Sequence, residues 1–245
     1  MKKCLILLLL VTSLISTATG DVLIRRRIHV NSFYHEGVQR PERTDTADLW
    51  IAPNRAACLV GAAKIIIDAG RDLVILVNDS AKTYAEAILS RPVAESMTSD
   101  DREAMPGHET KVRSHKTEGT RTILGRACQA YAIEIRSNLR HKVTAWVSAE
   151  VPVDLGAFRA LMTKFYAFLG RYDADSADSL LGIPGLVLSQ ESVADLKGET
   201  VRVNRDVVEM SEKTSPEGLF AVPSGYVKKA GLTHADVDMI ASILE

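Results

Sequence analysis

The chain has 245 residues, of which 46% are hydrophobic and 25% charged, and its formal net charge at pH 7 is −1. This length supports one sizeable core, so one domain is the better expectation. The charge is nearly balanced, which excludes the basic excess typical of nucleic-acid-binding proteins.

The first twenty residues have the layout of a secretory signal peptide. Lys2 and Lys3 form a positively charged start, residues 5–11 are an uninterrupted apolar run, and residues 18–20 form a small-x-small cleavage site. The apolar run is shorter than the roughly 20 residues that a membrane-spanning helix needs. We therefore expect cleavage before Asp21 and no stable membrane span, with residues 21–245 forming a single domain.

Most of the remaining chain has the pattern of β-strands. The runs predicted as strands are residues 22–33, 44–52, 55–67, 73–77, 112–124, 127–136, 142–151, 186–190 and 200–210. Residues 31–41 are predicted as a loop, and residues 82–86 fit either a further strand or the start of a helix. The early strands follow one another with no helix between them, which indicates an antiparallel meander.

One polar segment interrupts the strands. Residues 90–111 contain Pro92, Pro106 and Gly107 among many charged and hydroxyl side chains. This composition predicts a mobile, solvated insertion, with a short helix near residues 99–104.

Two helices are predicted downstream. Residues 154–169 begin at Asp154, a good N-cap residue, and residues 233–244 form a shorter C-terminal helix. Residues 171–179, between the first helix and the next strand, are polar and are predicted as a loop. The first helix carries one apolar stripe at spacings of three and four, made of Leu155, Phe158, Leu161, Met162, Phe165, Phe168 and Leu169.

The apolar stripe has two interpretations. It can pack directly on the sheet with nothing between, or it can form one wall of a cavity for an acyl chain or another hydrophobic ligand. Periodicity alone does not decide between them.

Three consecutive arginines lie in the first predicted strand. Alternation places Arg25 and Arg27 on its charged face and Arg26 on the apolar face, beside Ile24 and Ile28. Arg26 can lie at a strand end, pair with a carboxylate, or meet an acidic group of a ligand.

Cys58 and Cys128 both fall in predicted strands. In an exported protein they can form a disulfide if their Cα atoms come within about 7 Å. Otherwise they are two small buried hydrophobic side chains.

Motifs of known catalytic sites are missing from the sequence. There is no glycine-rich phosphate loop, no G-x-S-x-G or H-E-x-x-H motif, and no C-x-x-C pair. His108, Glu109 and His115 lack a recurrent ligand spacing, as do the acidic residues at 100–103 and 173–178. We therefore expect no enzymatic activity, no metal and no other cofactor.

Several motifs, in their order along the chain, carry a resemblance to known proteins. Residues 73–84, LVILVNDSAKTY, resemble a strand and turn of periplasmic proteins of the LolA/LolB-like kind. Residues 123–131, 143–147, 182–185 and 220–226 are similar to a family of secreted bacterial proteins, a domain of unknown function expected to share that fold. In that family a Gly-x-x-Cys-x-x-Tyr run precedes a strand ending in Trp, a helix, a Gly-hydrophobic-Pro turn and a closing Phe-x-x-Pro-x-Gly-Tyr.

The resemblance covers roughly residues 43–229 and implies a fold. That fold is of the α+β class: a strongly curved antiparallel sheet, or half-open β-barrel, with helices covering its concave face. In the lipoprotein carriers of this fold, the cavity holds acyl chains. The family brings no established activity, and no catalytic residue is transferred from it.

Two hypotheses on function follow. The first is a non-enzymatic periplasmic protein that binds a lipid or an acyl chain between sheet and helix. The residues assigned to this site are Phe158, Leu161, Met162, Phe165, Phe168, Trp146 and Tyr131. The alternative is an envelope protein-interaction or scaffold module with a filled, dry core, in which edge strands or residues 90–111 contact a partner protein.

Three structural outcomes separate the hypotheses. A cavity lined by apolar groups favours the first. A filled barrel with an exposed apolar patch favours the second. Titratable groups clustered in a cleft indicate an enzyme instead.

Overall fold

The structure is a computed structural model that describes residues 20–35, 37–103, 110–136, 140–196 and 199–244. The predicted signal peptide, apart from Gly20, lies outside the described residues. The same holds for His108 and Glu109.

Fourteen strands and five helical segments make up the described chain. The strands are β1 (Val22–Val30), β2 (Phe33–His35), β3 (Val38–Arg40), β4 (Arg43–Ala52), β5 (Arg55–Val60), β6 (Ala63–Asp68), β7 (Leu73–Asn78), β8 (Thr83–Ile88), β9 (Lys111–Ile123), β10 (Arg126–Arg136), β11 (Arg140–Ser148), β12 (Leu186–Leu196), β13 (Glu199–Glu212) and β14 (Val227–Lys228). The helices are the 3₁₀ helix η1 (Val93–Ser96) and α1 (Ser99–Glu103), α2 (Leu155–Leu169), α3 (Ala174–Leu181) and α4 (His234–Leu244).

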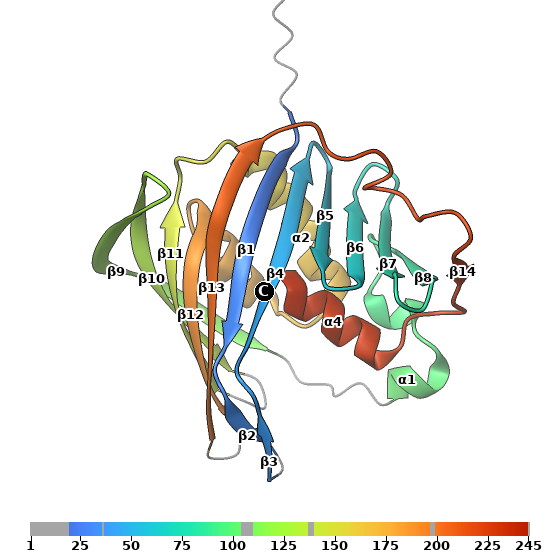
Figure 1. Cartoon of the computed structure of the whole chain (residues 1–245), viewed down its shortest axis with the longest axis horizontal. Coiled ribbons are helices and arrows are strands. Elements are labelled where there is room, and N and C mark those ends of the chain that lie inside the picture. Colours follow the sequence, from blue (N-terminus) through green and yellow to red (C-terminus); the bar gives the residue numbers. More distant parts are fainter. Residues whose placement is uncertain (1–19, 36, 104–109, 137–139, 197–198, 245) are drawn as a thin grey trace, which may run out of the picture.

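Twelve strands form one curved sheet in the order β14-β8-β7-β6-β5-β4-β1-β13-β12-β11-β10-β9 (Figure 1). β1 lies in the interior, between a meander of β4 to β8 and a second meander of β9 to β13. Every pair is antiparallel except the short edge pair of β14 with β8. β14 and β9 are the two ends of this order and lie at opposite ends of the sheet, so the predicted half-open antiparallel architecture is confirmed.

Irregular pairing accompanies the curvature. The register shifts between β1 and β13 at Arg25/Arg26, between β10 and β9 at Gln129/Tyr131, and between β11 and β12 at Trp146/Val147. Each shift adds local twist and bends the strand that carries the extra residue. These shifts all occur in the part of the sheet between β1 and β9.

The main core lies between the concave face of the sheet and two helices. Ile24 and Leu49 from the sheet share one buried cluster with Phe165 of α2 and Ile240 of α4. Ile240, like Phe165, is fully buried. The expectation that helices cover the concave face is therefore confirmed.

The opposite face of β1 and β4 to β7 is also covered. Leu219 and Phe220, in the segment after β13, pack there against Trp50 and Ile66. This second layer explains the unbroken run Ile65-Ile66-Ile67, whose members are all fully buried although they alternate between faces.

Three local predictions were wrong. Residues 55–67 are not one strand but the hairpin β5–β6, because Gly61, with φ +56°, starts a tight turn. Residues 171–179 are not a loop, since Asp173 caps α3 and accepts a hydrogen bond from Ser176 N at 2.8 Å. The predicted loop at 31–41 contains the small β2–β3 hairpin.

The polar segment at 90–111 connects β8 to β9. In the sheet, β8 is next to the edge strand β14 and β9 is the opposite edge strand, so the segment joins opposite edges. The short helix expected near residues 99–104 is present as α1. The first part of the segment is not solvated, since Val93 and Met97 are buried in the main core and Met97 bridges to Leu232. Residues 104–109 lie outside the described residues, and the mobility of the segment stays a prediction.

Candidate ligand-binding pocket

A pocket of about 490 Å³ lies between the inner face of β10 to β13 and the helices α2 and α3. Its lining residues are Arg26, Phe33, Ile133, Ile135, His141, Val143, Leu155, Phe158, Arg159, Met162, Tyr166, Tyr172, Leu180, Leu181, Ile183, Gly185, Leu186, Val187, Gln190, Ser192, Ala194, Val201, Val203 and Arg205. Aliphatic and aromatic side chains dominate this wall. Its volume falls in the range of about 300–1,000 Å³ that is common for small-molecule sites.

Local capping interactions place α2 against the pocket. The carboxylate of Asp154 accepts hydrogen bonds from Gly156 N at 2.9 Å and Ala157 N at 3.0 Å, which starts the helix. Gly170, with φ +62°, ends it. The chain then turns so that Tyr166 and Tyr172 meet edge to face, with ring centroids 5.3 Å apart, and both rings line the pocket.

α3 is fastened to the edge strand β9. Ser176 Oγ accepts a hydrogen bond from Val112 N at 2.8 Å, and Ser179 Oγ accepts one from Ser114 N at 3.0 Å. These bonds use backbone donors that an edge strand otherwise leaves unpaired. They hold Leu180 of α3 over the pocket.

Gly185 fixes the start of β12 at the pocket wall. Its φ is +144°, and a Cβ atom there would lie 2.4 Å from Ser148 O of β11. No larger residue fits without moving the backbone. The predicted turn at residues 182–185 thus brings two strands of the wall into close contact.

The structure divides the predicted apolar stripe of α2 into two parts. Phe158 and Met162 line the pocket, together with Leu155 and Tyr166. Leu161, Phe165, Phe168 and Leu169 are buried in the main core and do not line the pocket, while Met162 belongs to both. Residues four apart share one flank of a helix, so a single wide stripe serves both the core and the pocket.

The two predicted site residues on the sheet do not line the pocket. Tyr131 packs in the neighbouring cluster of Ile133 and Val143. Trp146 lies under Arg121, whose guanidinium carbon is 4.2 Å from the ring centroid. Ligand binding by any of the seven predicted residues stays a prediction.

Sequence reasoning missed the contributions of α3, β12 and β13 to the wall. Val201, Val203 and Arg205 alternate along β13, and Gln190, Ser192 and Ala194 alternate along β12. This period of two was readable in the sequence, but it did not show which face is the inner one.

Cys58 and Cys128 are free and buried, so the possible disulfide is not formed. The strands that carry them, β5 and β10, are separated in the sheet by β4, β1, β13, β12 and β11. Burial raises the pKa of the Cys58 thiol to about 12 and also raises the pKa of Cys128. Both therefore behave as small hydrophobic side chains.

The charged side chains that line the pocket all have one sign. They are Arg26, Arg159 and Arg205, and His141 adds a titratable base. No aspartate or glutamate is found among the described lining residues. The pocket thus combines an apolar wall with a positive charge.

Arg26 is the most unusual member of this group. Within the described part of the chain its guanidinium makes no hydrogen bond and no ion pair. Burial lowers the pKa of Arg26, and the nearby Cys58 and Tyr166 side chains offset this only in part. The Arg26 side chain is partly exposed, and it lines the pocket.

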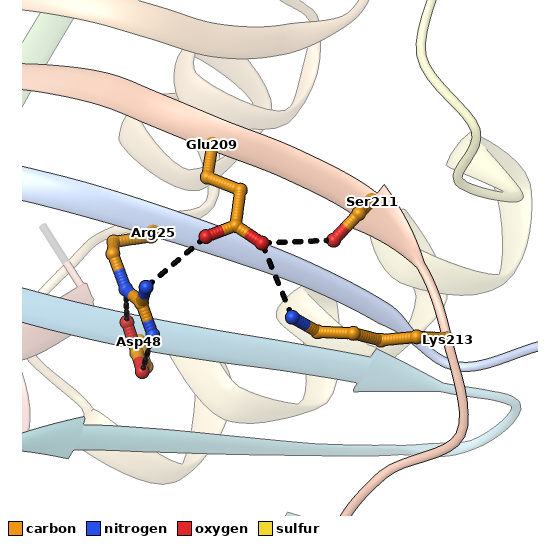
Figure 2. A network of polar contacts seen from close by, with 5 residues as sticks. All are labelled: Arg25, Asp48, Glu209, Ser211 and Lys213. Atoms are coloured by element: carbon orange, nitrogen blue, oxygen red, sulfur yellow. Dashed lines mark hydrogen bonds and ion pairs between the residues drawn. The ribbon is translucent and has the colours of Figure 1, made fainter.

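The neighbouring arginines are paired, as Figure 2 shows for Arg25. Arg25 donates to both carboxylate oxygens of Asp48, at 2.7 and 2.9 Å, and to Glu209 at 3.1 Å. Glu209 also accepts from Ser211 and Lys213. Arg27 pairs with Asp206 at 3.4 Å.

Two further features bear on the class of site. In the part of the chain that the structure describes, no group of three or more His, Cys, Asp or Glu side chains is arranged to hold a metal ion. None of the described helices is both long and apolar enough to cross a membrane.

A search of curated proteins found no match. Among solved structures, PNGF-II is 13% identical with a TM-score of 0.38, and the match covers 87% of this chain but only 32% of PNGF-II. A putative outer membrane lipoprotein-sorting protein domain from Vibrio parahaemolyticus is 10% identical with a TM-score of 0.32, covering 82% of this chain and 88% of that one.

A family model matches residues 52–226, which include every pocket-lining residue except Arg26 and Phe33. The matched segment also contains the motifs on which the resemblance to a family of secreted proteins was based. The chain therefore belongs to the DUF4412 family, a domain of unknown function.

Proposed function

We propose that this protein is a non-enzymatic binding protein of the bacterial envelope that holds a lipid or an acyl chain in the pocket between the sheet and α2. The observation that supports this most directly is the 490 Å³ pocket with its mainly apolar wall. A dry, filled core would leave no such space beside the helix.

The distribution of side chains on α2 adds support. Leu161, Phe165 and Phe168 are buried and anchor the helix in the main core. Phe158 is only half-buried and lines the pocket, so its ring is available to contact a ligand. Met162 belongs to the main core and also lines the pocket. Burying the apolar surface of a ligand against them provides about 25 cal/mol per Å² before the costs of association.

Location and lack of enzymatic activity are parts of the same proposal. The N-terminal arrangement of Lys2, Lys3 and the apolar run at 5–11 supports export to the periplasm. The sequence contains none of the common catalytic motifs, which supports a binding role.

The first test is binding of the uncharged fluorescent probe N-phenyl-1-naphthylamine to the purified mature protein. We expect saturable binding and enhanced fluorescence. Val203→Trp, which adds a large side chain to the pocket wall, should weaken binding at least about ten-fold by filling the space. Arg202→Trp is the matched control, because residue 202 is the preceding position on β13 and is exposed on the other face.

Native mass spectrometry and lipid extraction of the protein from the periplasm then identify what it carries. A near-stoichiometric lipid supports the proposal. No probe binding combined with a mass free of any adduct would overturn it and favour the interaction module. Equal loss of binding in the two tryptophan variants would place the site elsewhere.

A further inference from the structure

We infer that the pocket selects a long hydrocarbon chain that ends in an anionic group, and that Arg26 binds this group. The inference rests on the proposed function, because it specifies the ligand of the same pocket. The anion is a carboxylate, as in a fatty acid, or a phosphate, as in a phosphate monoester of a long-chain alcohol. Both accept two parallel hydrogen bonds from a guanidinium.

The position of Arg26 in the sheet directs its side chain inward. It shares its face of β1 with Ile24, which is fully buried in the main core. It lies opposite Val207 of β13 and Ala47 of β4, and both of those side chains are buried. The guanidinium therefore approaches the pocket from an apolar floor.

The groups around Arg26 do not neutralise it. The Cys58 thiol, on β5, keeps its proton because burial raises its pKa to about 12. The other side chain that acts electrostatically on Arg26 is Tyr166, on α2. Two acidic residues lie near this part of β1. Asp48 forms an ion pair with Arg25, and Asp206 forms one with Arg27.

Two neighbouring strands continue a polar row from Arg26 across the pocket. Arg205 is two residues from Val207 on β13, on the same face, and lies opposite Gln190 of β12. Arg26, Arg205 and Gln190 all line the pocket. A second cation and an amide thus lie beside Arg26, while Phe158, Met162 and Val203 form apolar wall.

This arrangement matches an amphiphile with one acidic end. A guanidinium held in apolar surroundings without a partner is unfavourable, and arginine does not lose its proton at physiological pH. A bound anion removes that penalty, and its apolar chain covers the remaining wall. A neutral lipid would leave the charge unpaired, and a cationic one would be repelled.

The test is competition for the pocket against N-phenyl-1-naphthylamine at pH 8. The competitors share one chain length: dodecanoate, dodecyl phosphate, dodecanol and dodecyltrimethylammonium. We expect the two anions to displace the probe about ten-fold better than dodecanol or more, as charge-assisted hydrogen bonds do, and the cation to be weakest. The ratio between dodecanoate and dodecyl phosphate identifies the preferred head group.

Arg26→Met carries the decisive comparison. It keeps an unbranched apolar side chain similar to the arginine stem and removes the charge, so the preference for dodecanoate over dodecanol should fall to about two-fold or less, with each variant referred to its own affinity for the probe. Arg27→Met, the next residue on the opposite face, should retain the full preference. Circular dichroism and thermal unfolding verify that both variants fold.

The outcomes separate the two proposals. Equal displacement by dodecanol and dodecanoate would overturn the inference and leave the proposed function standing. An anion preference that persists in Arg26→Met and disappears in Arg205→Met would overturn the role of Arg26. Absence of probe binding to the parent protein, combined with a mass free of any adduct, would overturn the proposed function itself.

Discussion

Arg25 and Arg26 are consecutive residues of β1 whose guanidinium groups lie on opposite faces of the sheet and in opposite electrostatic surroundings. Arg25 is held by Asp48 and Glu209 on the outer face, and these carboxylates raise its pKa. Arg26 lines the pocket, and burial lowers its pKa. One strand thus carries a paired structural arginine and an unpaired one that is available to a ligand.

This contrast predicts opposite effects of the same substitution on stability. In the ligand-free protein, Arg26→Met should raise the free energy of unfolding, by a value on the order of 1 kcal/mol, because it removes an uncompensated charge from apolar surroundings. Arg25→Met should lower it, because Asp48 then loses its bidentate partner. Urea denaturation of the parent and both variants measures this. A similar decrease in the free energy of unfolding of both variants would show that Arg26 also stabilises the fold.

Phe165 and Phe158 of α2 should contribute differently to stability and to probe binding. Phe165 is fully buried and stacks on Phe168 at 6.1 Å between centroids, so Phe165→Ala should cost about 3–5 kcal/mol of stability. Phe158→Ala should cost less, because the ring is only partly buried, and should weaken probe binding. Thermal unfolding and probe titration of the two variants provide the measurements. The reverse ranking of stability would show that Phe158 belongs to the core.

Asp173 caps α3, and its lowered pKa predicts that the stability of the protein depends on pH. Hydrogen bonds from Lys111 and Ser176 lower the pKa of Asp173 to about 2, from an ordinary value of 3.8. The carboxylate therefore stabilises the fold above pH 3.8 and loses this contribution as the pH falls through 2. Asp173→Asn should lower the Tm at neutral pH, and its difference from the parent should shrink near pH 2. A difference that does not change with pH would contradict this role of the charge.

Because both cysteines are buried, we expect the folded protein to resist thiol reagents. Cys58 and Cys128 are both buried with raised pKa values, so neither should react with iodoacetamide at pH 8, whereas both should react in concentrated guanidinium chloride. Mass spectrometry of the labelled peptides counts the modified sites. A peptide pair linked through these residues would show instead that the sheet permits their contact.

Local regularities of the sequence determined the elements and their faces. The period of two placed Arg26 opposite to Arg25 and Arg27, and Asp154 marked the start of α2, because both depend on backbone geometry within a few residues. The order of weak motifs predicted the family that the match at residues 52–226 confirmed. Features that depend on one residue were less predictive than these patterns. The turn at Gly61 and the helix cap at Asp173 were not predicted.

Only the tertiary structure decided which side chains share a space. The sequence showed one apolar stripe on α2, but in the folded protein Phe165 is buried in the core and Phe158 lines the pocket. It also decided that Cys58 and Cys128 lie on strands far apart in the sheet. The physical reason is that β1 pairs with β13, whose residues lie 173 to 190 positions away in the chain (from Val30 and Val203 to Val22 and Glu212), and no local pattern encodes that pairing. That pairing brings Arg26 and Arg205 to the same pocket wall.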